Sequence, residues 1–286
     1  MSDPLHLGLE SGGTKMIVGL GAPDGSVAAR ETIPTTTPDE TIPAIRAAAA
    51  RLTGGRRAAT LGIATFGPAQ TLEGRPRYGF ITATPKPGWS DTDLLGGLAD
   101  LAERTAFDTD VNGAALAEAA AWGGAAPLAY VTIGTGIGVG VAASGRTMAG
   151  TAHYEAGHVP VPRAPGDEGT CVCPFHDDCA EGLAAGPAWQ ARLGHSLSDE
   201  PENSLARAQA AFYLGQLCRT LAFAHAPGRV VMGGGVMKTP GLLEAVRGEA
   251  DRLIGGYGPG LPEIVPPMLG DEAGLRGAIL LGRAAG

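Results

Sequence analysis

Residues 5–22 read LHLGLESGGTKMIVGLGA, which is two apolar runs separated by a turn at Ser11–Thr14. Apolar runs joined by a glycine turn predict a β-hairpin. Residues 128–143 read LAYVTIGTGIGVGVAA and repeat this pattern around Gly134-Thr135-Gly136. Helical patterns follow each hairpin, so the chain contains a weak internal repeat. Such a repeat predicts two related α/β domains with a cleft between them.

The other apolar patterns predict the remaining strands and helices. Strands are expected at 26–33, 60–66, 107–111 and 229–232, and helices at 39–52, 91–106, 112–122, 205–224, 242–253 and 272–281. Between residues 150 and 186 lies a loop-rich insert that contains His, Cys and Pro. The last helix is expected to return to the first domain. The predicted domains are therefore residues 1–110 plus 268–286, and residues 111–267 with the insert.

Size and charge limit the classes of function. A chain of 286 residues is long enough for two domains of about 100–150 residues each. Its formal charge is −8, from 21 basic and 29 acidic residues. Because a negative surface repels phosphate backbones, we expect neither a nucleic-acid partner nor binding to anionic membranes. The polar start lacks the pattern of a secretory signal, and no apolar stretch is long enough to span a bilayer, so a cytoplasmic protein is expected.

Three glycine turns are candidate phosphate-binding sites, because backbone N–H groups without side chains can approach a triphosphate closely. The third turn follows the apolar run Arg229–Met232. Taken singly, each could be an ordinary turn. The chain lacks the P-loop pattern GxxxxGK[ST] and the HRD and DFG motifs of protein kinases. The candidate nucleotide-binding residues are Glu10, Gly12, Gly13, Thr14, Lys15, Gly134, Thr135, Gly136, Gly233, Gly234 and Gly235.

A series of short motifs runs along nearly the whole chain. They are LESGGTK at 9–15, GIATFGP at 62–68, TPKPGW at 84–89, DTDVN at 108–112, IGTGIG at 133–138, EAGH at 155–158, CPFHDDC at 173–179 and GGGV at 233–236. In this order they resemble the ROK family of sugar kinases, and within it the bacterial fructokinase branch. The resemblance implies an actin-like ATPase (ribonuclease H-like) fold of two α/β domains that close over ATP and sugar. It also implies phosphorylation of a hexose, with fructose favoured.

The resemblance implies that Asp110 is the general base. A hexose hydroxyl is a poor nucleophile at neutral pH, and a positioned carboxylate can accept its proton during phosphoryl transfer. The alternative is that Asp110 only caps the helix that follows it. The resemblance further implies sugar contacts from Asn112, Glu155 and Glu181, although Glu181 could be an ordinary acid at a helix start.

On the phosphate side, the resemblance implies that Thr14 and Thr135 contact the phosphates and that Glu10 acts through Mg²⁺. The segment 84–89 looks specific to the fructokinase branch. Its Lys86 could line the sugar site or lie exposed on a stiff loop, so neither Lys86 nor Trp89 is assigned a role.

Three of the four cysteines lie close together, at positions 171, 173 and 179. A disulfide framework would spread cysteines along the chain, so metal binding in a reducing cytosol fits better than loose thiols. The spacing H-x14-C-x2-H-x2-C suits a closed, structural Zn²⁺ site. The fructokinase branch resembles Cys-Pro-Tyr-His-Gly-Asp-Cys here, which favours His176 over Cys171, although the reverse stays open. The implied ligands are His158, Cys173, His176 and Cys179.

A sugar-responsive repressor and kinases for different sugars are the competing functions. The ROK family also contains such repressors, which carry an additional N-terminal helix-turn-helix of about 60–80 residues. Here the first hairpin begins at Leu5 and the charge is acidic, so a repressor is not expected. A non-catalytic regulator and kinases for glucose, mannose or N-acetylmannosamine stay open. The resemblance also makes a homodimer plausible.

Overall fold

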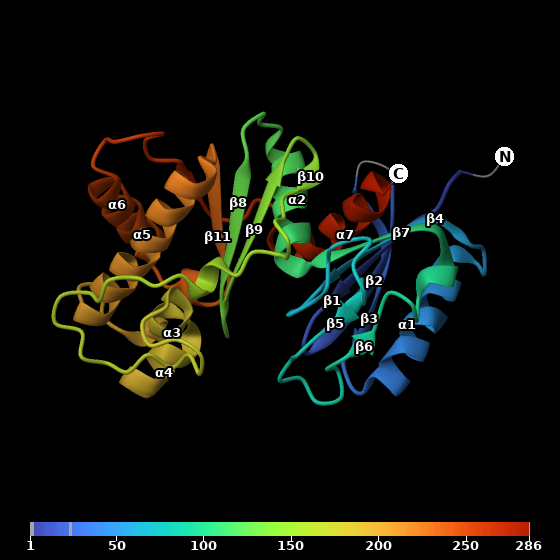
Figure 1. The fold of residues 1–286 in the computed structure, drawn as a ribbon, viewed down its shortest axis with the longest axis horizontal. Coiled ribbons are helices and arrows are strands. Elements are labelled where there is room, and N and C mark those ends of the chain that lie inside the picture. The colour runs from blue at the N-terminus through green and yellow to red at the C-terminus, as the bar shows by residue number, and fades with distance from the viewer. Residues whose placement is uncertain (1–2, 23–24, 286) are drawn as a thin grey trace. The chain divides into compact units, whose positions relative to one another are not determined.

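The computed structural model describes residues 3–22 and 25–285, and the first two residues of the polar start lie outside this part. Two five-stranded sheets organise the described chain (Figure 1). Helices alternate with the strands of both sheets along the chain, as the repeat of hairpin and helix patterns predicts. Among the described helices, none combines the length and the hydrophobicity that a bilayer-spanning segment needs.

The first sheet has the order β3-β2-β1-β4-β7. Its strands are β1 (His6–Ser11), β2 (Lys15–Gly21), β3 (Val27–Pro34), β4 (Ala58–Thr65) and β7 (Ala102–Thr109). The strands β1, β2 and β3 pair antiparallel, whereas β4 lies parallel to both β1 and β7. The predicted hairpin around Ser11–Thr14 is therefore β1–β2, and β1 is the central strand.

The second sheet repeats this arrangement with the order β10-β9-β8-β11-β12. Its strands are β8 (Leu128–Ile133), β9 (Ile137–Ala143), β10 (Arg146–Thr147), β11 (Arg229–Gly233) and β12 (Glu263–Val265). Here β11 lies parallel to β8 and to β12. In both sheets the first strand of the hairpin is central and pairs with the next parallel strand, so the internal repeat seen in the sequence is a repeat of topology.

Seven α-helices occur within the described residues. They are α1 (Pro38–Thr53), α2 (Asp110–Trp122), α3 (Ala180–Ala184), α4 (Gly186–Leu193), α5 (Leu205–His225), α6 (Leu242–Ile254) and α7 (Ala273–Ala284). One face of the first sheet packs on α1 and on segment 81–98 through an aliphatic core that includes Leu7, Leu9 and Ile45. The other face packs on α7.

The helix predicted at 91–106 is wrong. The structure has the short strand β6 (Thr92–Asp93, paired with β5, Phe80–Ile81), a series of turns, a 3-10 turn at Ala99–Leu101, and then β7. Leu94, Leu95 and Leu98 of this segment are buried, so their spacing reflects burial in the core rather than one helix face. Asp93 accepts a hydrogen bond from the N–H of Gly96 at 2.7 Å, so its side chain holds a turn here. Pairing with β4 then takes residues from Ala102 onward into the sheet.

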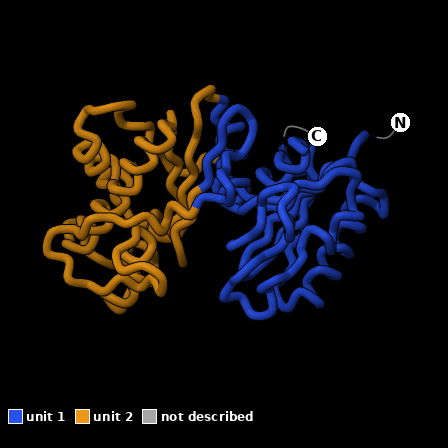
Figure 2. Tube along the Cα trace, in the orientation of Figure 1, with its two compact units in different colours: residues 1–123, 140–154, 269–286 blue, residues 124–139, 155–268 orange. Residues whose placement is uncertain are grey.

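The chain divides into two compact units (Figure 2). Unit 1 comprises residues 1–123, 140–154 and 269–286, and unit 2 comprises residues 124–139 and 155–268. The last helix, α7, belongs to unit 1 and packs there on β1, β4 and α2. The domain boundary expected at residues 110/111 stays a prediction.

Glycine residues allow α7 to lie against its neighbours with almost no separation. A Cβ atom at Gly277 of α7 would lie 2.0 Å from the carbonyl oxygen of Gly113 in α2. On β4, a Cβ atom at Gly62 would lie 1.8 Å from the carbonyl oxygen of Ala278. Both neighbours are backbone atoms and cannot turn aside as a flexible side chain can. The packing of α7 therefore depends on glycine, which has no side chain, at Gly62 and Gly277.

The substitution Gly277→Ala should lower the free energy of unfolding by about 1–3 kcal/mol, because the methyl group forces the backbones of α7 and α2 apart. Gly248→Ala is the matched control, since Gly248 is also within a helix but has nothing within 4 Å of an added Cβ. The control should be neutral or stabilising by up to about 1 kcal/mol. Chemical denaturation measures both. Equal effects of the two substitutions would contradict the close-packing account.

Candidate active site

The candidate base lies where β7 passes into α2. The Thr109 hydroxyl accepts a hydrogen bond from the N–H of Asn112 at 3.3 Å, which makes Thr109 the N-cap of the helix. The alternative role of Asp110 as the cap is therefore wrong. Asp110 is the first helical residue, and its Oδ1 accepts from the N–H of Val111 at 2.8 Å. The positive end of the helix dipole favours a carboxylate at this position.

Glu10 lies in the same unit, near the end of β1. Its carboxyl group faces Gly274 at the start of α7, where a Cβ atom would lie 2.5 Å from the Glu10 carboxyl carbon. Burial, and secondarily the charge of Asp110, raises the pKa of Glu10 to about 6, although Lys15 and the backbone N–H of Leu275 oppose this. Oε2 of Glu10 is buried and has no hydrogen-bond partner among the described residues.

The turn that follows Glu10 is held by backbone contacts. The N–H of Gly12 donates to the carbonyl of Lys15 at 3.0 Å, and the Thr35 hydroxyl donates to the carbonyl of Gly12 at 2.8 Å. Gly13, Thr14 and Lys15 are exposed at the tip. The role of this turn in phosphate binding stays a prediction.

In unit 2, two glycine turns meet at the carboxyl ends of parallel strands. The strand β8 leads into Gly134–Gly136, and β11 leads into Gly233–Gly235. Gly234 has φ +93°, and a Cβ atom there would lie 2.3 Å from the carbonyl oxygen of Ile133. The N–H of Gly186, at the start of α4, donates to the carbonyl of Gly134 at 2.8 Å. The carboxyl ends of strands in open α/β sheets are common ligand sites.

A cavity of about 630 Å³ opens beside these turns. Its lining includes Gly134, Thr135, Pro187, Trp189, Gln190, Leu197 and Gly235. A volume of this order is typical of small-molecule sites, and the mixture of apolar wall and glycine backbone suits a flat base joined to a polar group. Three residues proposed from the sequence thus line one cavity with residues of α4 that the sequence did not indicate.

Four candidate metal ligands converge in the insert. One ligand atom from each of His158, Cys173, His176 and Cys179 lies within 4.8 Å of the others. The three sulfur–nitrogen contacts, all through histidine Nδ1, measure 3.4, 3.7 and 3.8 Å. In a zinc tetrahedron with bonds of about 2.3 Å to sulfur and about 2.0 Å to nitrogen, these atoms are about 3.5 Å apart. The residues therefore fit a tetrahedral cation.

Cys171 lies beside this cluster without facing its centre. Its thiol donates to the carbonyl oxygen of His176 at 3.2 Å. It also fills the space next to Gly182, where an added Cβ would lie 2.2 Å from its sulfur. The geometry thus favours the expected choice of His176 over Cys171, which stays a prediction.

Two candidate sugar ligands adjoin the metal cluster. Oε1 of Glu181 lies 3.7 Å from Nε2 of His158, and its Oε2 accepts from the N–H of Ile137 at 2.8 Å. A carboxylate behind a ligating histidine is a common way to orient the imidazole. Glu155 is exposed, and its carbonyl accepts from the N–H of His158 at 2.9 Å. Within unit 2, the carboxylate of Glu181 and the backbone carbonyl of Glu155 therefore both contact His158.

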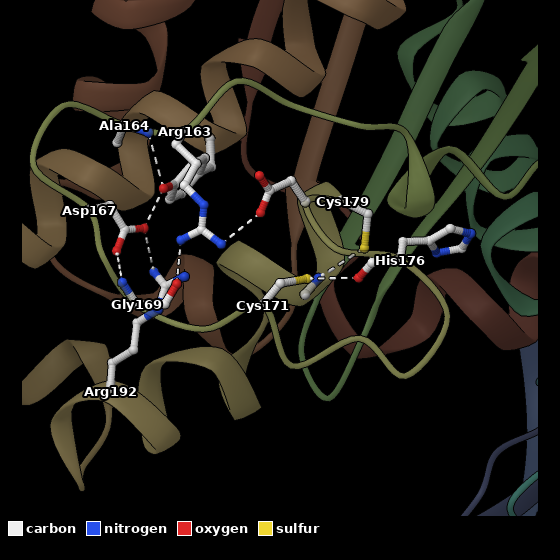
Figure 3. A network of polar contacts seen from close by, with 11 residues as sticks. Arg163, Ala164, Asp167, Gly169, Cys171, His176, Cys179 and Arg192 are labelled. Atoms are coloured by element: carbon white, nitrogen blue, oxygen red, sulfur yellow. Dashed lines mark hydrogen bonds and ion pairs between the residues drawn. The ribbon is translucent and has the colours of Figure 1, made fainter.

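A polar network anchors the loop between His158 and Cys173 (Figure 3). Asp167 pairs with Arg192 of α4 at 3.1 Å and accepts a hydrogen bond from the hydroxyl of Tyr213 in α5. Arg163 of the same loop pairs with Asp178, next to Cys179, at 2.7 Å. Sequence reasoning missed this network, because its members come from separate elements and form no local pattern.

Trp89 is a core residue. Its side chain is fully buried, its Nε1 donates to the carbonyl of Thr36 at 2.7 Å, and its ring packs edge-on against Phe66. Trp89 thereby connects the segment 84–89 to the hydrophobic core beside the first sheet. Lys86 is half-buried on that segment.

Comparison with known proteins identifies relatives over almost the whole chain. The model of the ROK family matches residues 6–285. The chain is 39% identical to a fructokinase of Pediococcus pentosaceus over 97% of both proteins. It is 42% identical to a fructokinase of Zymomonas mobilis over 97% of this chain and 96% of that protein.

Among solved structures, the ROK hexokinase of Thermus thermophilus superposes with a TM-score of 0.82 at 30% identity and covers 97% of both chains. Together with the repeated order of the two sheets, this similarity confirms the predicted actin-like ATPase fold. The resemblance found in the sequence motifs is confirmed as well.

The raised pKa of Glu10 predicts a pH-dependent contribution to stability. Between pH about 4.5 and about 6, the native state keeps a proton that the unfolded chain releases, so the free energy of unfolding falls as the pH rises. From pH 4 to pH 7, Glu10→Gln should therefore gain up to about 2 kcal/mol relative to the parent protein.

Denaturation at several pH values, without nucleotide, measures this difference. Glu103→Gln, at an exposed carboxylate of β7, is the control and should follow the parent protein throughout. A constant difference between Glu10→Gln and the parent from pH 4 to pH 7 would show that Glu10 has an ordinary pKa.

Proposed function

The chain belongs to the ROK family, and we propose that it is a fructokinase that transfers the γ-phosphoryl group of ATP to fructose and forms fructose 6-phosphate. The observation that carries this proposal is the 39–42% identity to fructokinases across nearly the full length of both proteins. ATP and a sugar are thus the proposed substrates. Glucose and mannose are the competing hexoses within the same family.

Asp110 is the proposed general base. Its carboxylate is held at the helix start by the N–H of Val111, so its direction is fixed before the sugar binds. It would accept the proton of the attacking hydroxyl while the phosphoryl group transfers. Most of the rate in such reactions comes from alignment and from stabilisation of phosphate charge.

The nucleotide is proposed to bind at the glycine turns of unit 2, with its base in the 630 Å³ cavity beside α4. Gly134, Thr135 and Gly235 would contact it there, and Thr14 and Lys15 of unit 1 are proposed phosphate contacts. Mg²⁺ would neutralise phosphate charge when bound, and Glu10 is the proposed carboxylate for it.

Zn²⁺ is proposed as a structural ion of the insert, held by the four converging side chains. It would fix His158 and, through it, the positions of Glu155 and Glu181, which are the proposed sugar contacts. Loss of the ion should then weaken sugar binding as well as stability. We also propose a cytoplasmic location, since clustered free thiols fit a reducing compartment. The proposed homodimer is supported by the family resemblance alone.

Asp110→Asn should reduce turnover by about 10²–10⁴-fold or more, because the amide cannot accept the hydroxyl proton. Asp39→Asn is the matched control, since Asp39 is an exposed acid in the first turn of α1 and should leave turnover unchanged. ADP release with ATP and Mg²⁺ is measured against fructose, mannose, glucose and N-acetylmannosamine.

A highest kcat/KM for another hexose would overturn the assignment of fructose alone. No turnover of any of these sugars by zinc-replete protein would overturn the kinase. An active Asp110→Asn variant would show that the base is another group.

Cys173→Ser should remove most of a zinc content of about one ion per chain, because the hydroxyl is a much weaker ligand than thiolate. Its fructose KM should rise and its Tm should fall. Cys171→Ser is the control and should keep its zinc, since the Cys171 thiol contacts a carbonyl instead. Elemental analysis and thermal unfolding measure these effects. Loss of zinc from the Cys171 variant as well as from the Cys173 variant would favour Cys171 over His176 as the fourth ligand.

A further inference from the structure

Asp108 is a buried carboxylate to which no role has been assigned. It is the next-to-last residue of β7, and its side chain receives three hydrogen bonds. Its Oδ1 accepts from the backbone N–H of Thr109 at 2.8 Å and from Nδ2 of Asn112 at 2.7 Å. Its Oδ2 accepts from the hydroxyl of Thr147 in β10 at 2.6 Å. All of these residues belong to unit 1.

The contact between Asp108 and Asn112 fixes which end of the amide faces away. Oδ1 of Asp108 already accepts a backbone N–H, so it is an acceptor and the Asn112 atom that faces it must be the NH₂ group. The carbonyl oxygen of the amide is therefore directed elsewhere. This oxygen, Oδ1 of Asn112, is buried and has no hydrogen-bond partner among the described residues.

The orientation of Asn112 does not depend on whether Asp108 is charged. Burial raises the pKa of Asp108, and the hydrogen bonds from Thr147, Asn112 and Thr109 oppose this. A proton on Asp108 would lie on Oδ2, toward the Thr147 hydroxyl, because Oδ1 is occupied by the backbone donor. In either state Oδ1 of Asp108 accepts from Asn112.

A buried acceptor without a partner is costly and is normally completed by a ligand or water. A sugar hydroxyl is a suitable donor for it. We propose that Asp108 is a positioning residue that holds the Asn112 amide with its carbonyl oxygen toward the sugar, so that Asn112 accepts a hydrogen bond from a sugar hydroxyl. This inference rests on the proposed function, in which Asn112 contacts the sugar.

The test is steady-state kinetics of the full chain with fructose and ATP, for Asp108→Ala, Asp108→Asn, Asn112→Ala and the double alanine variant. Asp108→Ala should raise the fructose KM about tenfold or more and leave the ATP KM unchanged, because only the sugar contact loses its orientation. Asp108→Asn is the conservative control. Its carbonyl oxygen can accept from Thr109 and Asn112 while its NH₂ donates to Thr147, so its fructose KM should stay within about twofold of the parent value.

The double variant separates positioning from a general effect on the fold. If Asp108 acts through Asn112, Asp108→Ala should have no further effect on the fructose KM once Asn112 is alanine. An equal effect of Asp108→Ala in both backgrounds would overturn the proposal, as would an unchanged fructose KM or an Asp108→Asn variant as impaired as Asp108→Ala.

A variant that fails to fold and a parent protein that is inactive on fructose lead to different conclusions. If Asp108→Ala does not fold, Asp108→Ser takes its place, since its hydroxyl can stay near the N–H of Thr109 but is too short to reach Asn112. Failure of both to fold would overturn the proposal in favour of a purely structural role. If the parent protein does not phosphorylate fructose, the proposed function fails first, and the cycle is measured with whichever hexose is turned over.

Discussion

The close approach of α7 to the first sheet is the constraint on which unit 1 depends. The face of the sheet toward α7 carries glycine at Gly8, Gly19 and Gly62, and α2 contributes Gly113. An added Cβ at Gly8, Gly19 or Gly62 would lie 2.7, 2.8 or 1.8 Å from the nearest atom of α7, whereas one at Gly113 would lie 2.9 Å from Ala64 of β4. The helix therefore lies directly on the backbone of β1 and β4. In turn, α7 supports α2 and places the N–H of Leu275 beside Glu10.

This packing positions polar groups that local sequence cannot bring together. The first turn of α2 carries Asp110 and Asn112, and the preceding strand β7 carries Asp108. Because β7, α2 and β10 converge in one unit, a buried carboxylate can orient an amide and leave one of its acceptors without a partner. In unit 2, tertiary packing likewise brings distant segments together. The parallel strands β8 and β11 place two glycine turns at one edge of the sheet, beside α4.

Many features were predictable because they depend on neighbours in the sequence. The two hairpins, the turns with exposed glycine, and the metal-ligand spacing are all local patterns, and the family motifs are combinations of these patterns. The helix predicted at 91–106 was wrong because Leu94, Leu95 and Leu98 are buried by tertiary packing rather than aligned on a helix. The sequence did not indicate a role for Asp108, because its hydrogen-bond partner Thr147 lies 39 positions away in the chain.

The sequence alone determined the repeated α/β topology, the family and the residue types available for base, phosphate and metal chemistry. It could do so because strand alternation, turn chemistry and ligand spacing act over a few residues. The tertiary structure alone decided that Thr109 and not Asp110 caps α2, that Cys171 turns toward a carbonyl, and that the Asn112 amide has one fixed orientation. Each of these depends on where a single side chain finds its hydrogen-bond partner, which only the folded chain specifies.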